Sequence, residues 1–567
     1  MVNHRKMRLI SQRAHLKNRA IRHDTALVVP CNNVNAQPYV KQLSRRSILL
    51  IGGAAVLLAA SLLGIHLART ARTPLSPHVP NSVAISASPS NADIDAAVDS
   101  GGKIRTDRRI YLEPSLPKLP RAGGKFVDPV FGTEIMRASD ATDFPAPGCS
   151  TFYSQWPTFN SNNTHLLIRC GNSGDMKIKA FDPVNFTLGA TLLTSPTLPG
   201  GVTLTWEGAT WSHTDPDLIF VHVNYYNADH PATGMKLYSY RPSTNVFRLI
   251  KDFAPSLAGG KPDYLFEMHV AQDEIFTLLH KRVGKSEPLY TIIWKRSTDT
   301  ILKHIATNDS HLPPQGSNAA LPDKSGRWIV FPSNGSPMAG EKRAAVLDLS
   351  KNSWQSIYWT GGDDSPSHGD FGTGTMVGIG QWSGAASIRP LSDVHAITKL
   401  FDMKDANGVT DWSNDKHTTM YADDESWAMM SLYDEGEVQE THAFENEVMQ
   451  FSTTDPSKFR RLLHHRSHID NLSDSTGYWA IPKATISRDG RFIAFTSNWE
   501  NSGRYDLFIA RIDPPAPLAL PAMKPSEAPK APSSSKAARP SRVTQGSKPG
   551  RTGAKDSGKI IPPLRRQ

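Results

Sequence analysis

The side chains with the clearest chemical potential are histidines and carboxylates that recur at comparable places in the chain. His269, His368 and His417 each lie near the start of a β-rich run, and Glu207 and Glu267 occupy similar positions. Imidazole and carboxylate groups together suit a divalent transition metal. We therefore expect one divalent metal ion wherever the fold brings the three histidines together.

A second group of residues is suited to moving protons or contacting a ligand. His464, His465 and Tyr478 are candidate general bases, since each carries a group that can accept a proton within hydrogen-bond reach of a substrate. Trp479 and Lys483 follow closely and are candidates for ligand binding, together with Glu207 and Glu267.

Each of these residues has a structural alternative. The histidines can be hydrogen-bonded strand-end residues, the glutamates charges at the mouth of a channel, and the tryptophan a packing residue. The His464 and His465 stretch can also be a polar turn. No nucleophile elbow, His-Glu-x-x-His, phosphate-binding loop or Cys-x-x-Cys pair occurs in the sequence, which disfavours hydrolase, nucleotide-binding and zinc-ribbon functions.

A repeated hairpin must position these residues. "ATISRDGRFIAFTSNW" at 484–499 reads as two strands joined by an Asp-Gly turn, because Asp-Gly supplies the positive φ that a tight hairpin needs. Comparable turn-and-strand runs begin the other units, which lie at 156–170, 210–223, 269–281, 321–334, 368–380 and 419–434. Most are followed by one or two further apolar runs. A period near 50 residues is typical of four-stranded blades arranged around an axis.

The repeat predicts an all-β fold, a seven-bladed β-propeller of four-stranded antiparallel blades spanning 125–513. The last unit shows three strands, and "GTEIMRASD" at 132–140 precedes the first unit as an unassigned strand. Joining that strand to the last blade removes an unpaired sheet edge. A six-bladed ring is the alternative, because glycines crowd the fifth unit.

The stretch at 484–499 is similar to the repeat of the TolB-like, WD40-like propellers, and the last blade also resembles that of the oligogalacturonate lyases. The first resemblance implies protein binding, and the second implies β-elimination on uronic-acid polymers. The lyase family's metal cluster uses a Gln-x-x-His-x-His pattern. Here Gln439 and His442 fit that pattern, but Phe444 stands in place of its second histidine.

The N-terminus predicts a membrane anchor. About 21 mainly apolar residues fall within 48–68, enough to cross a bilayer as a helix, and the basic segment 1–47 before them is expected to remain in the cytoplasm. Arg45 and Arg46 resemble a twin-arginine export signal. We expect an uncleaved anchor rather than a removed signal peptide, because small residues are missing from a cleavage position.

Composition accounts for the remaining segments. Residues 69–124 read as a disordered stalk and 514–567 as a disordered basic tail rich in Pro, Ser and Lys, either a solubilising extension or a contact for acidic polymers and headgroups. Residues 1–46 and 514–567 each carry about +9, so a net charge of +10 leaves the middle of the chain near −8. Nucleic acid is therefore disfavoured as a partner. Cys149 and Cys170 are the two cysteines beyond the anchor and are expected to form a disulfide.

These observations predict a membrane-anchored propeller outside the cytoplasm, in the periplasm or at the cell surface. It is expected to bind a protein or a surface glycan through its central funnel. The alternative is a carbohydrate-active enzyme, a metal-assisted polysaccharide lyase of uronic-acid polymers. An acidic folded part disfavours a polyanionic ligand, unless a local basic funnel with residues such as Lys416 and Lys483 overrides it.

Overall fold

The computed structural model describes residues 104–514, with gaps at 114, 116–117, 173, 195–196, 199–203, 205, 336–337, 339, 360–366, 380–383, 411–414, 435–441 and 470–474. Within those ranges no helix is long and apolar enough to span a membrane. The predicted anchor at 48–68 and the basic segment 1–47 lie outside the described residues, as does the tail from residue 515 onward.

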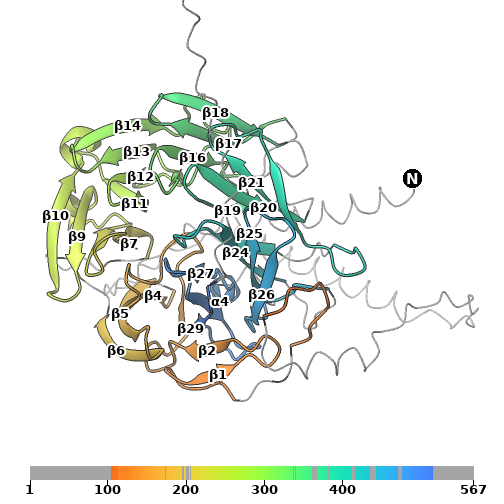
Figure 1. Cartoon of the computed structure of the whole chain (residues 1–567). Helices are drawn as coiled ribbons and strands as arrows, with labels where there is room; N and C mark the ends of the chain where they lie inside the picture. The colour runs from red at the N-terminus through yellow and green to blue at the C-terminus, as the bar shows by residue number, and fades with distance from the viewer. Residues whose placement is uncertain are drawn as a thin grey trace, which may run out of the picture. The chain divides into compact units, whose positions relative to one another are not determined.

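Each predicted unit forms an antiparallel four-stranded blade, and the blades follow one another around a ring in chain order (Figure 1). Both faces of a blade are covered by its neighbours, so the inner strands are buried along their length instead of alternating between core and solvent. The first three blades are β3 (Cys149–Ser150), β4 (His165–Cys170), β5 (Asp175–Asp182) and β6 (Thr187–Thr194); β7 (Ala209–Trp211), β8 (Ile219–His222), β9 (Lys236–Arg241) and β10 (Val246–Asp252); and β11 (Asp263–Ala271), β12 (Ile275–Arg282), β13 (Tyr290–Lys295) and β14 (Thr300–Ala306).

The fourth to sixth blades repeat this order. They are β15 (Leu321–Pro322), β16 (Trp328–Pro332), β17 (Lys342–Asp348) and β18 (Ser353–Tyr358); β19 (Ser367–Phe371), β20 (Thr375–Ile379), β21 (Ala385–Pro390) and β22 (Thr398–Asp402); and β23 (Asp415–Thr419), β24 (Trp427–Tyr433), β25 (Glu447–Ser452) and β26 (Phe459–His464). The glycine-rich fifth unit is therefore a complete blade, and the ring has seven blades rather than six.

The seventh blade joins the two ends of the folded chain. Its strands β27 (Thr485–Ile486), β28 (Phe492–Ser497) and β29 (Asp506–Arg511) continue into β2 (Glu134–Arg137), which pairs antiparallel with β29. The predicted N-terminal strand is confirmed in this role. A fifth strand, β1 (Lys125–Val127), covers the outer edge of β2 and was not predicted.

Apolar clusters between neighbouring blades hold the ring together. In β2, Ile135 packs with blades six and seven, whereas Met136 packs with blades seven and one. Successive strand residues point to opposite faces, so this short strand fills two of the interblade cores. The described residues contain one such cluster at each of the seven blade interfaces.

The predicted polar turns add a second ring of contacts on one face of the propeller. Side chains in or beside the turn after each innermost strand form hydrogen bonds to the next blade. In order around the ring, the joined pairs are Asn160–Pro216, Ser212–Asp273, Gln272–Lys324, Gly374–Asp323, Thr373–Glu425, Arg488–Asp423 and Asn163–Asp489. The same turns therefore connect the strands of each hairpin and also join neighbouring blades around the ring.

In the described ranges, two short 3-10 helices, a π-helical turn and one α-helix connect the strands. They are η1 (Trp206–Gly208), η2 (Pro231–Thr233), η3 (Ala254–Ala258) and α4 (Ser475–Ala480). The last of these matters most, because α4 lies in the connection between blades six and seven and carries Tyr478 and Trp479.

The expected stalk ends earlier than predicted, because the chain already packs on the propeller from residue 104. Arg105 bridges to Arg461 of blade six, and the Arg108 guanidinium donates to the carbonyl of Asp402, 2.6 Å away, beside the Phe401 ring. Tyr111 is buried. The propeller body therefore includes a strap over residues 104–113 that composition alone suggested was disordered.

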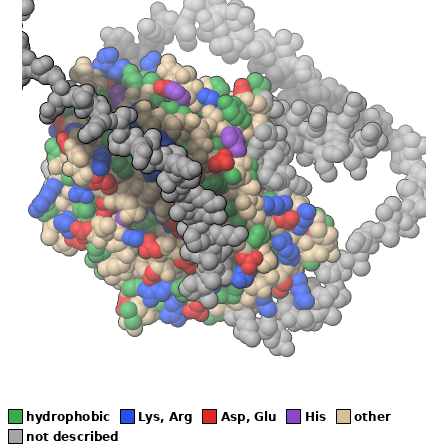
Figure 2. All heavy atoms as spheres, turned by 45° about the horizontal axis from the view of Figure 1, so that its top comes forward, with side chains coloured by type: hydrophobic (Ala, Val, Ile, Leu, Met, Phe, Trp, Pro, Cys, Tyr) green, Lys and Arg blue, Asp and Glu red, His purple; other side chains and the backbone are tan. Residues whose placement is uncertain are grey.

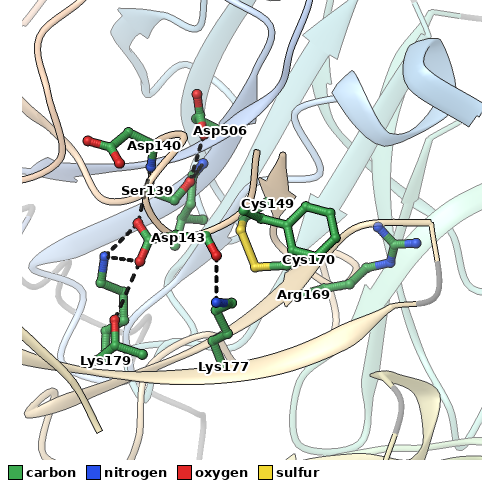
Figure 3. The surroundings of a disulfide bond; sticks show 12 residues. Ser139, Asp140, Asp143, Cys149, Arg169, Cys170, Lys177, Lys179 and Asp506 are labelled. Atoms are coloured by element: carbon green, nitrogen blue, oxygen red, sulfur yellow. Dashed lines mark hydrogen bonds and ion pairs between the residues drawn. A yellow bond between two sulfur atoms is a disulfide. The ribbon is translucent and has the colours of Figure 1, made fainter. Parts of the chain in front are cut away.

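The predicted Cys149–Cys170 disulfide is present and joins directly paired residues of β3 and β4 (Figure 3). Beside it Lys179 forms an ion pair with Asp143 at 2.9 Å. The Arg169 side chain points away from this cluster. The disulfide thus fixes the strand end from which Arg169 extends.

Truncating a β2 side chain is expected to destabilise the whole ring. Ile135 is 1% exposed, so Ile135→Ala should lower the free energy of unfolding by about 2–4 kcal/mol through the cavity it leaves. Val127 in β1 is 57% exposed, so the matched Val127→Ala change should cost less than about 0.5 kcal/mol. Chemical denaturation of the full chain measures both. Equal effects for the two variants would mean that β2 does not complete blade seven.

Candidate functional site

The central channel is crossed by a segment of blade one. β3 ends at Ser150, and pairing with β4 resumes only at Phe159, which bridges to Leu166. Residues 151–158, here called the plug loop, leave the sheet between these points. Tyr153 reaches His417 of blade six, with 2.8 Å between the hydroxyl and Nε2.

The plug loop also reaches blade three. The Trp156 indole nitrogen donates to the carbonyl of Met268 at 3.1 Å, and the indole stacks on the His269 ring with 4.5 Å between centroids. A loop from blade one that contacts blades three and six spans the channel. It divides the channel into an upper funnel, where the innermost strands begin, and a lower mouth, where they end.

Six residues from the blades and their connections lie close together where the innermost strands begin, and this group is here called the upper funnel. They are Arg169, Glu207, Glu267, Tyr478, Trp479 and Lys483. Arg169 ends β4, Glu207 lies in η1, and Glu267 lies within β11. Five of the six were predicted from sequence as site residues. Arg169 was missed, although an arginine at the end of the apolar run His165–Cys170 is a detectable signal.

Two cationic side chains share one aromatic ring in this funnel. The Arg169 guanidinium carbon lies 3.3 Å from the Trp479 ring centroid, and Lys483 Nζ lies 4.5 Å from the same centroid. Lys483 Nζ also lies 3.8 Å from the Tyr478 centroid and donates to the Tyr478 carbonyl at 2.9 Å. Helix α4 therefore provides an aromatic ring that both cationic side chains contact.

Burial changes which of the funnel groups carry charge. Burial, and then the neighbouring Glu267, raise the pKa of Glu207 to about 8. Burial, and then Arg169, hold the pKa of Lys483 well below its ordinary value. Burial raises the pKa of Tyr478 to about 12, so this phenol is a hydrogen-bonding group rather than a base. Near neutral pH Glu207 is therefore mostly protonated, and the positive charges that act on it are those of Lys281 and Arg169.

Three residues of the channel wall have a left-handed backbone conformation. Glu267 has φ 45°, His368 φ 47° and Lys483 φ 41°. Glu267 and His368 also lie at β-bulges in their strands. Such conformations are unfavourable for non-glycine residues and concentrate at functional sites, so these observed outliers favour a functional role for the channel wall.

His368 and His417 lie together, but not in a metal-binding arrangement. Their rings stack with 4.4 Å between centroids and 12° between planes. Lone pairs of parallel imidazoles lie in the ring planes and do not converge on one ion. His269 is engaged elsewhere, with Nε2 2.8 Å from Glu267 Oε1.

The described residues contain no group of three or more His, Cys, Asp or Glu side chains able to hold a metal. His269, His368 and His417 do not form such a group in the described part of the chain, and the metal site stays a prediction. Of the family's metal pattern, Gln439 lies outside the described residues, His442 Nδ1 lies 3.1 Å from Glu445, and Phe444 is buried in the core between blades five and six.

The histidine pair instead belongs to a hydrogen-bonded cluster on the channel wall. Asp415 lies 3.5 Å from His368 Nδ1 and accepts a hydrogen bond from the Tyr433 hydroxyl at 3.2 Å. Neighbouring protein atoms partly desolvate Asp415 and oppose its ionisation, but the adjacent His368 holds its pKa below the ordinary value. Burial lowers the pKa of His417 well below its usual range. Asp415 remains 52% exposed, so this cluster presents a carboxylate to the channel.

The candidate bases His464 and His465 do not reach the funnel. His464 Nε2 lies 3.0 Å from the carbonyl of Tyr111, in the strap, and its ring packs on Phe131. His465 contacts the Leu432 carbonyl, and burial lowers its pKa to about 4. Both imidazoles are buried at the end of blade six, where His464 is the last residue of β26, rather than exposed in a polar turn.

Comparisons with known proteins agree with the fold. No family model and no curated protein matches the chain. A structure of oligogalacturonate lyase in complex with manganese matches with 14% identity over 70% of this chain and 97% of its own, with a TM-score of 0.48. Oligogalacturonate lyase from Vibrio parahaemolyticus matches with 12% identity, covering 73% and 99%, and a TM-score of 0.47.

The WD40 repeats of RRP9 match with 7% identity over 65% of this chain and 94% of theirs, with a TM-score of 0.36. The strand order itself makes the chain a seven-bladed β-propeller. The predicted resemblances to WD40-like and oligogalacturonate lyase propellers are confirmed as likenesses of fold. Propellers carry many unrelated functions, so function must come from the site.

The raised pKa of Glu207 predicts a specific pH dependence of stability. Between about pH 4.5 and pH 8 the folded protein keeps a proton that the unfolded chain releases, so this group's contribution to stability falls as the pH rises. Glutamine does not titrate, so the Glu207→Gln variant does not lose stability through this group as the pH rises. The variant should gain about 2 kcal/mol over the wild type between pH 5 and pH 8.5, below the ceiling of about 5 kcal/mol that such a shift sets.

Chemical denaturation at the two pH values measures this gain, with exposed Glu287→Gln as the matched control. A constant difference between wild type and Glu207→Gln at both pH values would contradict the assigned protonation state.

Proposed function

We propose that the protein is a membrane-tethered propeller, held outside the cytoplasm, that binds a carboxylate-bearing ligand in the upper funnel. The apolar segment 48–68 supports the tether. The observation that carries the binding proposal is a buried guanidinium, Arg169, in a funnel whose nearest carboxyl group, Glu207, is protonated near neutral pH.

The funnel walls favour a glycan or peptide segment over a small inorganic anion. Tyr478 and Trp479 are partly exposed and lie beside the two cationic side chains, so an apolar ring face can pack on them while a carboxylate pairs with Arg169. Tyr153 of the plug loop lies on the other side, with its ring centroid 5.6 Å from Lys483 Nζ. We therefore favour a uronic-acid-containing surface glycan, with an acidic protein segment as the alternative.

The face of the propeller shown in Figure 2 does not favour a general polyanion. On the face shown in Figure 2, Lys and Arg side chains are interspersed with Asp and Glu. A broad basic patch is what binding to a phosphate backbone requires. We therefore propose anion recognition for the upper funnel alone, even though the folded part as a whole is acidic.

Removing the buried guanidinium tests this proposal. Arg169→Met should weaken binding of a short uronic-acid oligomer by about 10- to 100-fold, since a buried charge pair is lost. Lys324→Met is the matched control at the lower mouth, where Lys324 already pairs with Glu425 at 3.2 Å, and it should change the affinity less than about twofold. Calorimetric titration with a neutral oligomer as the reference ligand provides the readout. Equal affinity of Arg169→Met and wild type would exclude the proposed anchor.

A second candidate function is cleavage of the same ligand by β-elimination, and one observation favours it. Glu207 and Lys483 have pKa values displaced toward neutrality from opposite directions, which is the pattern of an acid and base pair. The neutral Lys483 amine would remove the proton beside the carboxylate, Arg169 would stabilise the developing charge, and Glu207 would protonate the leaving oxygen. No step is assigned to a metal, because the histidines do not converge.

Incubating the full chain with uronic-acid polymers and following the absorbance of unsaturated sugars tests the lyase candidate. Activity should fall at least about 100-fold in Lys483→Arg and in Glu207→Gln. His368→Ala and His417→Ala should retain most activity if the histidine pair is structural. A flat trace with wild type on every uronic-acid polymer would remove this candidate and leave binding alone.

A further inference from the structure

We infer that Lys483 is a carbonyl-reactive amine that forms an imine with a small keto or aldehyde acid in the upper funnel. This inference does not depend on whether the funnel binds or cleaves a glycan. It rests on the surroundings of Nζ, on the position of Arg169 and on the strained backbone of Lys483.

The Lys483 amine is enclosed and has no counter-ion among the described residues. The residue is 1% exposed, and its Nζ lies over the rings of Tyr153, Tyr478 and Trp479 at 5.6, 3.8 and 4.5 Å from their centroids. Its hydrogen bond to the Tyr478 carbonyl uses one N–H. No carboxylate of the described part of the chain lies within ion-pair distance of Nζ, in contrast to Lys179, which pairs with Asp143.

The balance of forces on this amine favours its neutral form. Aromatic faces stabilise a desolvated ammonium, but only modestly. Full burial without a counter-ion lowers a lysine pKa by up to about 3–5 units, which corresponds to a larger free energy. Arg169 adds repulsion, and the pKa of Lys483 is held well below its ordinary value as a result. A desolvated lysine beside a second cation is an activated nucleophile toward carbonyl compounds.

Arg169 indicates the class of carbonyl compound. The guanidinium and the amine lie over one Trp479 ring, so the Arg169 guanidinium carbon and Lys483 Nζ are no more than about 8 Å apart, the sum of their two ring distances. A carboxylate held by Arg169 therefore places an adjacent carbonyl carbon within reach of Nζ. A keto or aldehyde acid fits this spacing, whereas a simple ketone lacks the anchor.

The funnel also contains a proton donor for the second half of the reaction. The amine lone pair adds to the carbonyl carbon, and a proton moves from nitrogen to oxygen to give a carbinolamine. Loss of the hydroxyl as water, with a proton supplied by an acid and returned from nitrogen, leaves the imine. Glu207 and Lys483 both lie close enough to Arg169 to interact with its charge, and Glu207, whose pKa is raised to about 8, is the acid we assign to this step. No oxidant or reductant is needed.

Reductive trapping on the wild-type full chain tests the inference without relying on a variant. With pyruvate as the probe and cyanoborohydride at pH 7, peptide mapping should find one carboxyethyl group on Lys483, formed at least about tenfold faster than on any other lysine. Acetone, which lacks a carboxylate, should modify Lys483 at least about tenfold more slowly than pyruvate does.

Two variants test whether trapping of pyruvate at Lys483 depends on Arg169. Arg169→Met should reduce trapping by pyruvate to the rate seen with acetone, while Lys324→Met should leave trapping at Lys483 unchanged. Near-ultraviolet circular dichroism confirms that each variant is folded. Two results would overturn the inference. In one, the lysines are modified in the order of their solvent exposure; in the other, Lys483 stays unmodified in folded wild-type protein. Failure of the glycan-binding experiment leaves this result unaffected.

Discussion

The pairing of β2 with β29 is the interaction on which the rest of this structure depends. It joins residues near 135 to residues near 510, so its four residue pairs close nearly the whole propeller into a ring. The loop-closure entropy of such a distant pairing is large, and it is offset by the burial of Ile135 and Met136 in the two cores flanking blade seven. The hydrogen bonds that the polar turns form with the next blade also hold the ring closed at each of its interfaces.

Closure also assembles the upper funnel. Lys483 and Trp479 come from the connection into blade seven, whereas Arg169 comes from blade one, and these two blades become neighbours only when the ring closes. The disulfide between Cys149 and Cys170 then fixes the strand that carries Arg169, and the plug loop brings Tyr153 near Lys483. Three channel residues adopt left-handed conformations that non-glycine residues disfavour. At these positions the structure of the ring outweighs the local backbone preference.

Much of the fold could be predicted from sequence because its signals are local and repeated. Asp-Gly type turns followed by apolar runs at a regular period predict blades, and one unmatched strand at 132–140 predicts the closure. The strap at 104–113 could not be predicted, because Arg105 and Arg108 are held by distant carbonyls and rings of blades five and six rather than by neighbours in sequence. The plug loop was likewise missed, since an interrupted strand does not alter the period.

The site was predicted less well for a related reason. Equivalent strand positions identify which residues lie near an axis, but not the direction of their side chains. His368 and His417 do lie together, yet stacking turns their nitrogen atoms toward different partners, and Tyr153 of the plug loop takes one of them. His464 and His465 are sealed by the strap. Arg169 becomes significant only because the folded ring places Trp479 against it.

Amide hydrogen exchange of the full chain tests ring closure most directly. β29 lies between β28 and β2, so the account predicts that the amides of Asp506–Arg511 exchange as slowly as those of the interior strand β25, and far more slowly than the outermost strands β10 and β18. Rapid exchange in β29, at the rate of those outer strands, would show that the seventh blade has an open edge. The ring, and the funnel that it assembles, would then not exist as described.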